Sequence, residues 1–176
     1  MNQPAPLKLD LACGTAKKPG FFGVDISAGA HADFVCDLRT APWPWADASV
    51  AEINCAHFFE HLDAAQRVTF MDECWRILVP GGKLVVTVPH ARSDGAVQDP
   101  THEWPPLVEQ SFLYFDREAR ARLAFAETRV KADFQVQIGI AFQDEWVQRP
   151  QAERMFALRH FYNVALEITA FMTKRG

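Results

Sequence analysis

Apolar and polar positions alternate over short stretches in the first half of the chain, and each stretch ends in turn-forming residues. This pattern is typical of β-strands, whose side chains point to opposite faces in turn. The last stretch is instead a continuous run rich in β-branched residues, which is typical of a strand covered on both faces. The predicted strands are 7–13, 21–27, 32–38, 49–57 and 83–90.

One stretch of this half, 63–79, has helical periodicity. Asp63 and Gln66 form the pattern of a capping box at its start, and the Pro-Gly-Gly at 80–82 is expected to end it. The residues expected on its apolar stripe are Val68, Met71, Trp75 and Leu78. Strands, a helix and then a buried strand predict an α/β fold with an open sheet.

The second half of the chain begins with a polar, proline-broken loop at 91–110, and loops of this length are usually functional or disordered. A helix is expected over 111–125, followed by strands at 133–142 and 162–174. We expect these last two strands to add an antiparallel edge to the sheet.

Composition limits what the chain can do. Its 176 residues, 49% of them hydrophobic, are enough for one domain with a sizeable core. A net charge of −4 argues against nucleic acid as the main partner, because phosphate binding needs a basic face. The start lacks the pattern of a signal peptide, and no apolar run approaches the length of a membrane span. The four cysteines lie singly, as reduced packing residues do, so we expect a cytoplasmic protein with no membrane contact.

Carboxylates stand near the ends of three successive predicted strands, at Asp10, Asp25 and Asp37. The carboxyl ends of strands are where ligands bind in an open α/β sheet. Asp25 is placed to bind a ribose diol and Asp37 an exocyclic adenine amine, whereas Asp10 lies deeper and suits a cationic amine or a water. The small residues at 12–14 would let the backbone approach a ligand closely. Together these residues predict a pocket for a positively charged nucleoside.

Five sequence blocks resemble the class I S-adenosylmethionine-dependent methyltransferases, in particular the compact branch related to methyltransferase type 11. The resemblance covers roughly 7–116, with the rest of the chain following more loosely. The blocks are LDLACGTAKKPGFFGVDIS, ADFVCDL, WPWADASVAEINCAHFFEHL, MDECWRILVPGGKLVVTVPH and DPTHEWPPLVEQSFLYFD. The family implies a Rossmann-like, doubly wound, mostly parallel sheet that ends in an antiparallel hairpin, with S-adenosyl-L-methionine as cofactor.

The resemblance also implies which residues hold this cofactor. Asp10, Ala12, Cys13 and Gly14 would lie beside its methionine part, and Asp25 would bind the ribose. Asp37 and the backbone of Leu38 would contact the adenine, and His57 would lie near the reacting methyl group. The chain is expected to consist of a cofactor-binding core at 7–90, a lid and substrate loop at 91–109, and a C-terminal helix with antiparallel strands at 110–176.

Three departures from the family pattern matter. Ala12 replaces the usual first glycine, which narrows the space beside the cofactor, and Ala51 replaces an aspartate that is common in the fourth strand. Only 11 positions (25 − 14) separate Gly14 from Asp25, so the helix between the first two strands is expected to be missing or reduced to a turn. These departures keep open a second function, that of a non-catalytic cofactor-binding module or an activating subunit.

Two other enzyme classes share parts of this sequence. A nicotinamide dehydrogenase needs G-x-G-x-x-G, but the corresponding positions hold Ala12, Gly14 and Lys17. The segment HFFEH at 57–61 fits the inverted zinc-peptidase pattern H-x-x-E-H, with Glu60 as general base. No third ligand stands out downstream, although Glu109 and Glu118 are candidates. Because the segment lies inside a methyltransferase block, we expect no metal site.

The long loop supplies the remaining candidates. His102 and Asp99 could contact substrate, and Trp104 could line a substrate pocket. His102 and His57 are also the candidate catalytic bases, since imidazole titrates near neutrality. Two other loop tryptophans, Trp43 and Trp45, are at least as suited to packing a turn, and Tyr114 is expected in the core.

The predicted reaction is an in-line transfer of the methyl group to an acceptor, in a site from which the 91–109 loop excludes water. If the acceptor arrives deprotonated, no general base is needed. A net-acidic chain with an aromatic-flanked loop favours a small molecule over nucleic acid as the acceptor.

Overall fold

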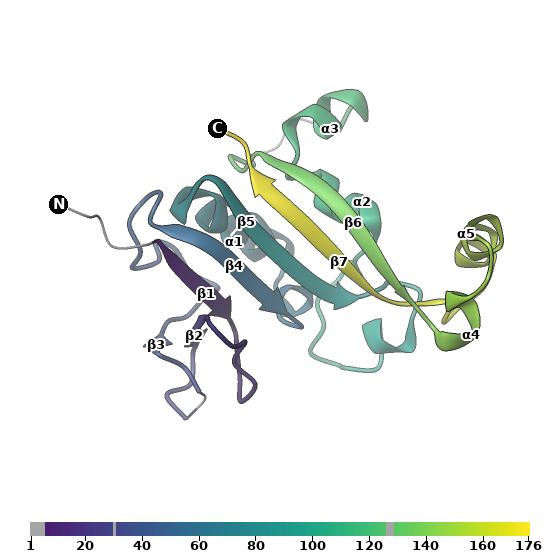
Figure 1. The fold of residues 1–176 in the computed structure, drawn as a ribbon, viewed down its shortest axis with the longest axis horizontal. Helices are drawn as coiled ribbons and strands as arrows, with labels where there is room; N and C mark the ends of the chain where they lie inside the picture. The colour runs from purple at the N-terminus through teal and green to yellow at the C-terminus, as the bar shows by residue number, and fades with distance from the viewer. Residues whose placement is uncertain (1–5, 30, 126–128) are drawn as a thin grey trace.

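A computed structural model of the chain describes residues 6–29, 31–125 and 129–176, and it contains one seven-stranded sheet of order β3-β2-β1-β4-β5-β7-β6 (Figure 1). The strands are β1 (Leu7–Leu11), β2 (Phe22–Asp25), β3 (Phe34–Val35), β4 (Val50–Ala56), β5 (Leu78–Pro89), β6 (Phe134–Phe142) and β7 (Ala165–Lys174). β1 to β5 pair in parallel, and β7 pairs antiparallel with both β5 and β6. This is the predicted mostly parallel, Rossmann-like sheet with a C-terminal antiparallel hairpin.

The helices are shorter and fewer than a doubly wound sheet of this size usually carries. They are α1 (Ala64–Ile77), α2 (Glu109–Leu113), α3 (Arg117–Arg122), α4 (Asp144–Val147) and α5 (Gln151–His160), with the 3-10 turns η1 (Phe59–His61) and η2 (Asp94–Ala96). The described residues between β1 and β2 form turns and no helix, as the short spacing predicted.

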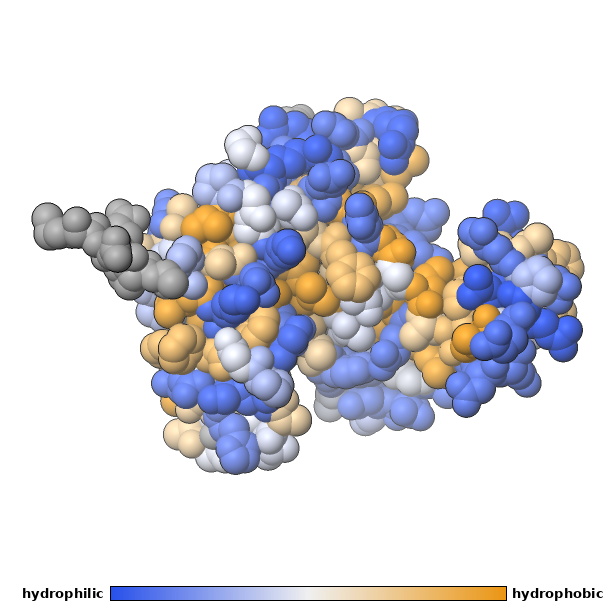
Figure 2. All heavy atoms as spheres, viewed as in Figure 1, coloured by the Kyte–Doolittle hydropathy of each residue, from blue (hydrophilic) through white to orange (hydrophobic). Residues whose placement is uncertain are grey.

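Helices cover only one face of the central strands. α1 and α2 lie behind the sheet in Figure 1, and the side chains pointing to that face, such as Leu84 and Val86, are fully buried. On the opposite face Val85 and Thr87 are half-buried, and Phe171 of the neighbouring β7 is 48% exposed. Figure 2 shows that the surface on this side mixes hydrophilic and hydrophobic residues. The prediction that 83–90 is covered on both faces is therefore wrong, because no helix of the described residues covers the second face.

The boundaries of α1 also differ from the prediction at one end. Asp63 accepts a hydrogen bond from the backbone N–H of Gln66 while the Gln66 side chain accepts one from the backbone of Asp63, so the capping box is confirmed. The helix ends at Ile77, however, and the Pro-Gly-Gly at 80–82 bulges within β5.

The buried face of α1 is rotated from the predicted stripe. It consists of Arg67, Phe70, Met71, Glu73, Cys74 and Ile77, and Val68 and Trp75 lie at its margin. Periodicity read from apolar residues alone missed this face because two of its members are charged.

Two predicted elements are smaller than expected. The strand expected over 32–38 is reduced to the two residues of β3. The helix expected over 111–125 is broken into α2 and α3 at Asp116, whose carboxylate accepts hydrogen bonds from two backbone N–H groups of the first turn of α3. An aspartate that satisfies free N–H groups in this way starts a new helix rather than continuing one.

The core lies between the covered face of the sheet and α1, and aromatic rings fill much of it. Trp43 and Trp45 are buried there against each other, and Trp43 also packs against Phe70, so they pack a turn. Tyr114 is 38% exposed and stacks on Phe125, so its predicted place in the core is wrong.

The four cysteines are free, as predicted. Burial raises the pKa of the Cys55 and Cys74 thiols well above the ordinary value, which keeps them protonated and unreactive. Within the described residues there is no helix long and apolar enough to cross a membrane.

Candidate cofactor and acceptor site

Three neighbouring cavities open at the carboxyl ends of the parallel strands. The first, of about 280 Å³, is lined by residues that include Asp25, Asp37, Leu38 and Phe58. The second, of about 400 Å³, is lined by residues that include Asp10, Cys13, Lys18, Asn54 and His57. The third, of about 620 Å³, lies beyond His57 and is bounded by η1, η2 and the start of β7. Ala12 lines the first two cavities and His57 lines the last two, so the three form a continuous series.

Asp25 ends β2 and holds the loop that follows β1. Its Oδ2 accepts a hydrogen bond from the backbone N–H of Gly14 at 3.0 Å, and its Oδ1 accepts one from the N–H of Ser27 at 3.0 Å. The carboxylate is half-buried and lines the first cavity. Each oxygen has one of its acceptor positions filled, which leaves a second position for a hydroxyl group of a ligand.

Asp10 is buried, and the chain itself supplies its partners. Asn54 donates to Oδ1 from its amide at 2.7 Å, and the backbone N–H of Lys18 donates to Oδ2 at 2.7 Å. The chain itself therefore supplies the partners for which the sequence had suggested a cationic amine or a water. Its main structural effect is to hold the turn at Lys18 against β4.

Asp37 lies two residues beyond β3 and is bridged by Arg39. The guanidinium group contacts both carboxylate oxygens at 2.9 Å, and this pairing lowers the pKa of Asp37. A ligand amine that binds Asp37 would therefore share the carboxylate with Arg39, which also lines the first cavity.

The loop after β1 adopts conformations that favour glycine. Ala12 has φ +53° and Gly14 has φ +51°, so the alanine that replaces the family's first glycine is held in the left-handed region. It does not close the site, because cavities open on both of its sides. At Gly23 in β2, an added Cβ would lie 2.8 Å from Cys13 Sγ, from the carbonyl oxygen of His31 and from Lys17 Cδ, so glycine lets this loop pack directly on the strand.

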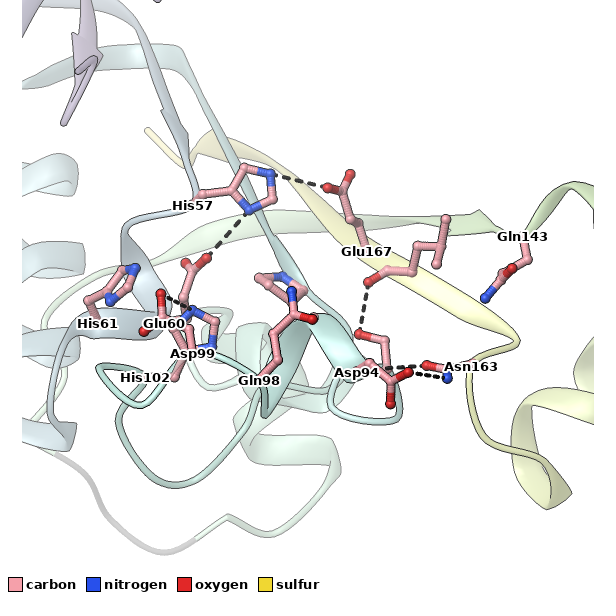
Figure 3. Close-up of a pocket in the computed structure, with 14 residues that line it drawn as sticks. His57, Glu60, His61, Asp94, Gln98, Asp99, His102, Gln143, Asn163 and Glu167 are labelled. Atoms are coloured by element: carbon pink, nitrogen blue, oxygen red, sulfur yellow. Dashed lines mark hydrogen bonds and ion pairs between the residues drawn. The ribbon is translucent and has the colours of Figure 1, made fainter. Parts of the chain in front are cut away.

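His57 follows β4 directly and has φ +55°, a strained conformation that turns its half-exposed side chain toward β7. Its Nε2 lies 3.1 Å from Glu167 Oε1, and its Nδ1 lies 3.5 Å from Glu60 Oε1 (Figure 3). Two carboxylates from different elements therefore hold the imidazole at the boundary between the second and third cavities.

Titratable side chains gather at both ends of the third cavity (Figure 3). At one end, Asn163 donates to Asp94 at 2.7 Å and links the segment before β7 to η2. At the other end lie Glu60, His61 and His102. Glu60 is buried, and burial raises the pKa of its carboxyl group above the ordinary value.

The structure brings together most of the residues predicted for the site. Asp99 and His102 line the third cavity, as a substrate role would require, whereas Trp104 does not line it and is 81% exposed. Sequence reasoning missed Glu167, which reaches His57 from a strand 110 positions (167 − 57) further along the chain.

The zinc-peptidase arrangement is not formed. His57 precedes η1 and lies against Glu60 and Glu167, so it does not share a helical face with His61. The candidate third ligands are engaged elsewhere: Glu109 faces His90 at 3.7 Å, and Glu118 pairs with Arg175 at 3.2 Å.

Comparison with known proteins agrees with this geometry. Residues 9–86 match the family model described as a methyltransferase domain, and this range includes all the residues that line the first two cavities. No curated protein matches the chain.

Many solved structures share the fold. A methyltransferase dependent on S-adenosylmethionine from Archaeoglobus fulgidus is 17% identical, with a TM-score of 0.69 over 96% of this chain and 86% of that one. A putative methyltransferase in complex with the Trm112 activator, from Haloferax volcanii, is 17% identical, with a TM-score of 0.58 over 99% of this chain and 84% of that one. A phosphoethanolamine N-methyltransferase from Haemonchus contortus, in complex with S-adenosyl-L-methionine, is 14% identical, with a TM-score of 0.50 over 98% of this chain and 50% of that one.

Proposed function

We propose that this chain, a class I S-adenosylmethionine-dependent methyltransferase of the type 11 branch, catalyses methyl transfer to a small molecule bound in the third cavity. The observation that carries this proposal is the position of His57. It lines both the second cavity, beside the loop after β1, and the third cavity. A donor in one cavity and an acceptor in the other would meet at this residue.

The residues present fit the cofactor, because the first two cavities are open and acidic groups line both of them. Asp25 would accept from the ribose hydroxyls, and Asp37 with the backbone of Leu38 would contact the adenine. The methionine part would lie along the second cavity, whose proposed contact residues are Asp10, Ala12, Cys13 and Gly14. When bound, the cofactor supplies a methyl group activated by the adjacent sulfonium.

His57 is the proposed base and takes the proton that an acceptor O–H or N–H group loses. Glu167 and Glu60 lie against its two nitrogens and fix the direction in which they point. His102 is the second candidate, because its ring lines the same cavity. An acceptor that arrives deprotonated would need only alignment.

The loop at 91–109 is proposed as the lid and specificity element between the cofactor-binding core, 7–90, and the C-terminal part, 110–176. It contributes Ser93, Asp94, Asp99 and His102 to the third cavity. The carboxylates that line this cavity disfavour a phosphate-rich acceptor, which supports a small molecule over nucleic acid.

The test combines binding with turnover. S-adenosylhomocysteine is titrated calorimetrically into the wild type, and methyl transfer from labelled S-adenosylmethionine is measured against a panel of small hydroxyl and amine compounds. His57→Gln should keep the binding and lower the rate by about 100-fold or more, the usual contribution of a general base. His31→Gln, at an exposed histidine outside the three cavities, is the matched control and should change neither.

Two outcomes would count against the proposal. Binding without transfer to any compound of the panel would favour the non-catalytic cofactor-binding module. Turnover that survives deletion of residues 94–103 would contradict the role of the loop.

A further inference from the structure

We propose that Glu60, His61 and His102 bind a divalent transition-metal ion in the third cavity. The site itself requires only these residues, but its role in catalysis rests on the proposed function. Its three ligand atoms, one per residue, all lie within 4.8 Å of one another. All three residues line the third cavity, so remaining coordination positions of an ion would be open to it.

Among the described residues, the hydrogen bonds of the two imidazoles involve only Nδ1 of each ring. His102 Nδ1 lies 3.1 Å from the carbonyl oxygen of Ala96. His61 Nδ1 lies 3.3 Å from the carbonyl oxygen of Thr101 and 3.0 Å from its hydroxyl. A carbonyl oxygen only accepts, so each Nδ1 donates, and in the neutral imidazole Nε2 then carries the lone pair. Metal-binding histidines show this arrangement, in which a backbone carbonyl fixes the tautomer and the ring direction.

Within the part of the chain that the structure describes, one oxygen of Glu60 has no hydrogen-bond partner. Its side chain is only 7% exposed, and its Oε2 is buried and accepts no hydrogen bond. The other oxygen faces His57 Nδ1 at 3.5 Å, which is too long for a good hydrogen bond. A buried carboxylate without a partner is costly, and a cation bound at Oε2 would remove that cost.

The surroundings position the three groups without contributing to the ligand set. Glu103 donates its backbone N–H to the carbonyl of Glu60 at 2.9 Å, which ties the loop carrying His102 to η1. The Arg67 guanidinium donates to the carbonyls of both Glu60 and Glu103. Asp99 lies 4.0 Å from His102 Nε2 and could bind a metal-bound water.

Two imidazole nitrogens and one carboxylate oxygen select the class of ion. Mg²⁺ and Ca²⁺ prefer sets made entirely of oxygen atoms, whereas Zn²⁺, Mn²⁺, Co²⁺ and Fe²⁺ accept this mixed set. With three protein ligands, such an ion keeps open positions for water or for an oxygen of the acceptor. In the proposed reaction the ion would orient a hydroxyl acceptor beside His57 and favour loss of its proton.

The test uses the full chain without an affinity tag, after treatment with EDTA. Zn²⁺, Mn²⁺ and Mg²⁺ are titrated calorimetrically, and Co²⁺ binding is followed by visible absorption. We expect one site per chain that binds Zn²⁺ and Co²⁺ more tightly than Mg²⁺. Glu60→Gln and His102→Gln should each weaken Zn²⁺ binding by about 100-fold.

The matched controls are Glu118→Gln and His31→Gln, which remove the same groups from exposed positions and should bind like the wild type. The metal-free variants are checked by thermal unfolding, so that a lost site is not confused with a lost fold.

Equal Zn²⁺ affinity in wild type, Glu60→Gln and His102→Gln would overturn the proposal, as would a Co²⁺ spectrum with a thiolate charge-transfer band. S-adenosylhomocysteine binding is measured on the same samples and should not change in these variants. A protein that binds Zn²⁺ through these residues but not S-adenosylhomocysteine would keep the metal site and refute the proposed function.

Discussion

The carboxylates of the cofactor cavities and the Glu60 carboxylate of the third cavity differ in how their hydrogen bonds are satisfied. Asp10 and Asp25 accept from backbone N–H groups or an amide of the chain, and Asp37 pairs with Arg39. Glu60, by contrast, is buried with one oxygen unpartnered, and it faces two imidazoles with free nitrogens.

The difference shows which region is formed before any ligand binds. In the cofactor region the charged groups hold the loop after β1 in shape, so a ligand would meet a fixed surface and lose little affinity to reorganisation. In the third cavity one buried oxygen of Glu60 lacks a hydrogen-bond partner within the described chain, so a ligand or ion would complete it.

Asp25→Ala should have the largest effect. It removes the acceptor of the Gly14 and Ser27 N–H groups together with the proposed ribose contact. Losing charge-assisted hydrogen bonds of this kind costs about 3 kcal/mol, so S-adenosylhomocysteine should bind about 100-fold more weakly. Calorimetry measures this, and unchanged affinity would place the cofactor elsewhere. Zn²⁺ affinity should not change, which separates the two regions.

Gly23→Ala tests whether the cofactor loop is as tightly packed as its contacts indicate. The new Cβ would lie 2.8 Å from the carbonyl oxygen of His31, a backbone atom that cannot move cheaply. Overpacking of this kind costs about 2 kcal/mol, or roughly 4–8 °C in the unfolding midpoint. The control is Gly29→Ala, where the nearest atom is 3.6 Å away and the midpoint should stay within about 2 °C. A midpoint for Gly23→Ala as high as that of the control would contradict this packing.

Trp104→Ala tests the proposed lid. The side chain is 81% exposed, so its removal should leave the free energy of unfolding within about 0.5 kcal/mol of the wild type. If the loop closes over the acceptor, KM for the acceptor should rise about tenfold, equivalent to about 1.4 kcal/mol, while S-adenosylhomocysteine affinity stays constant. An unchanged KM would show that Trp104 does not contribute to acceptor binding.

Ala12→Gly should have the smallest effect, and it should be stabilising. Ala12 has φ +53°, where glycine avoids a steric cost of about 1 kcal/mol. The unfolding midpoint should rise by roughly 2–4 °C. A lower midpoint would mean that the methyl group contributes packing that outweighs the strain.

The sheet and the cofactor region could be predicted because they depend on local patterns. Alternating runs located the strands, and the short spacing between Gly14 and Asp25 predicted the missing helix. The consequence of that missing helix was not anticipated, because a β-branched run reads as buried on both faces even when only one face is covered. The residues of 83–90 themselves do not indicate that one face of this strand lacks a covering helix.

The third cavity could be predicted only in part, because it depends on a loop that folds back onto η1. The sequence identified His102 as a candidate by itself. Its position beside Glu60 and His61 depends on contacts between residues about 40 positions apart in the chain. Arg67 organises these contacts from the buried face of α1, where an apolar pattern does not point to an arginine. The sequence did contain a signal for this role, because Arg67 is a charged residue at a position in line with the apolar stripe of the helix.

The most direct test of the account is amide hydrogen exchange with and without S-adenosylhomocysteine, resolved along the chain. Binding should slow exchange at 10–16, 23–27 and 36–39, the segments that line the first two cavities, and leave 94–103 unchanged. Slowed exchange confined to 94–103, or no change in the first three segments at saturating ligand, would contradict it.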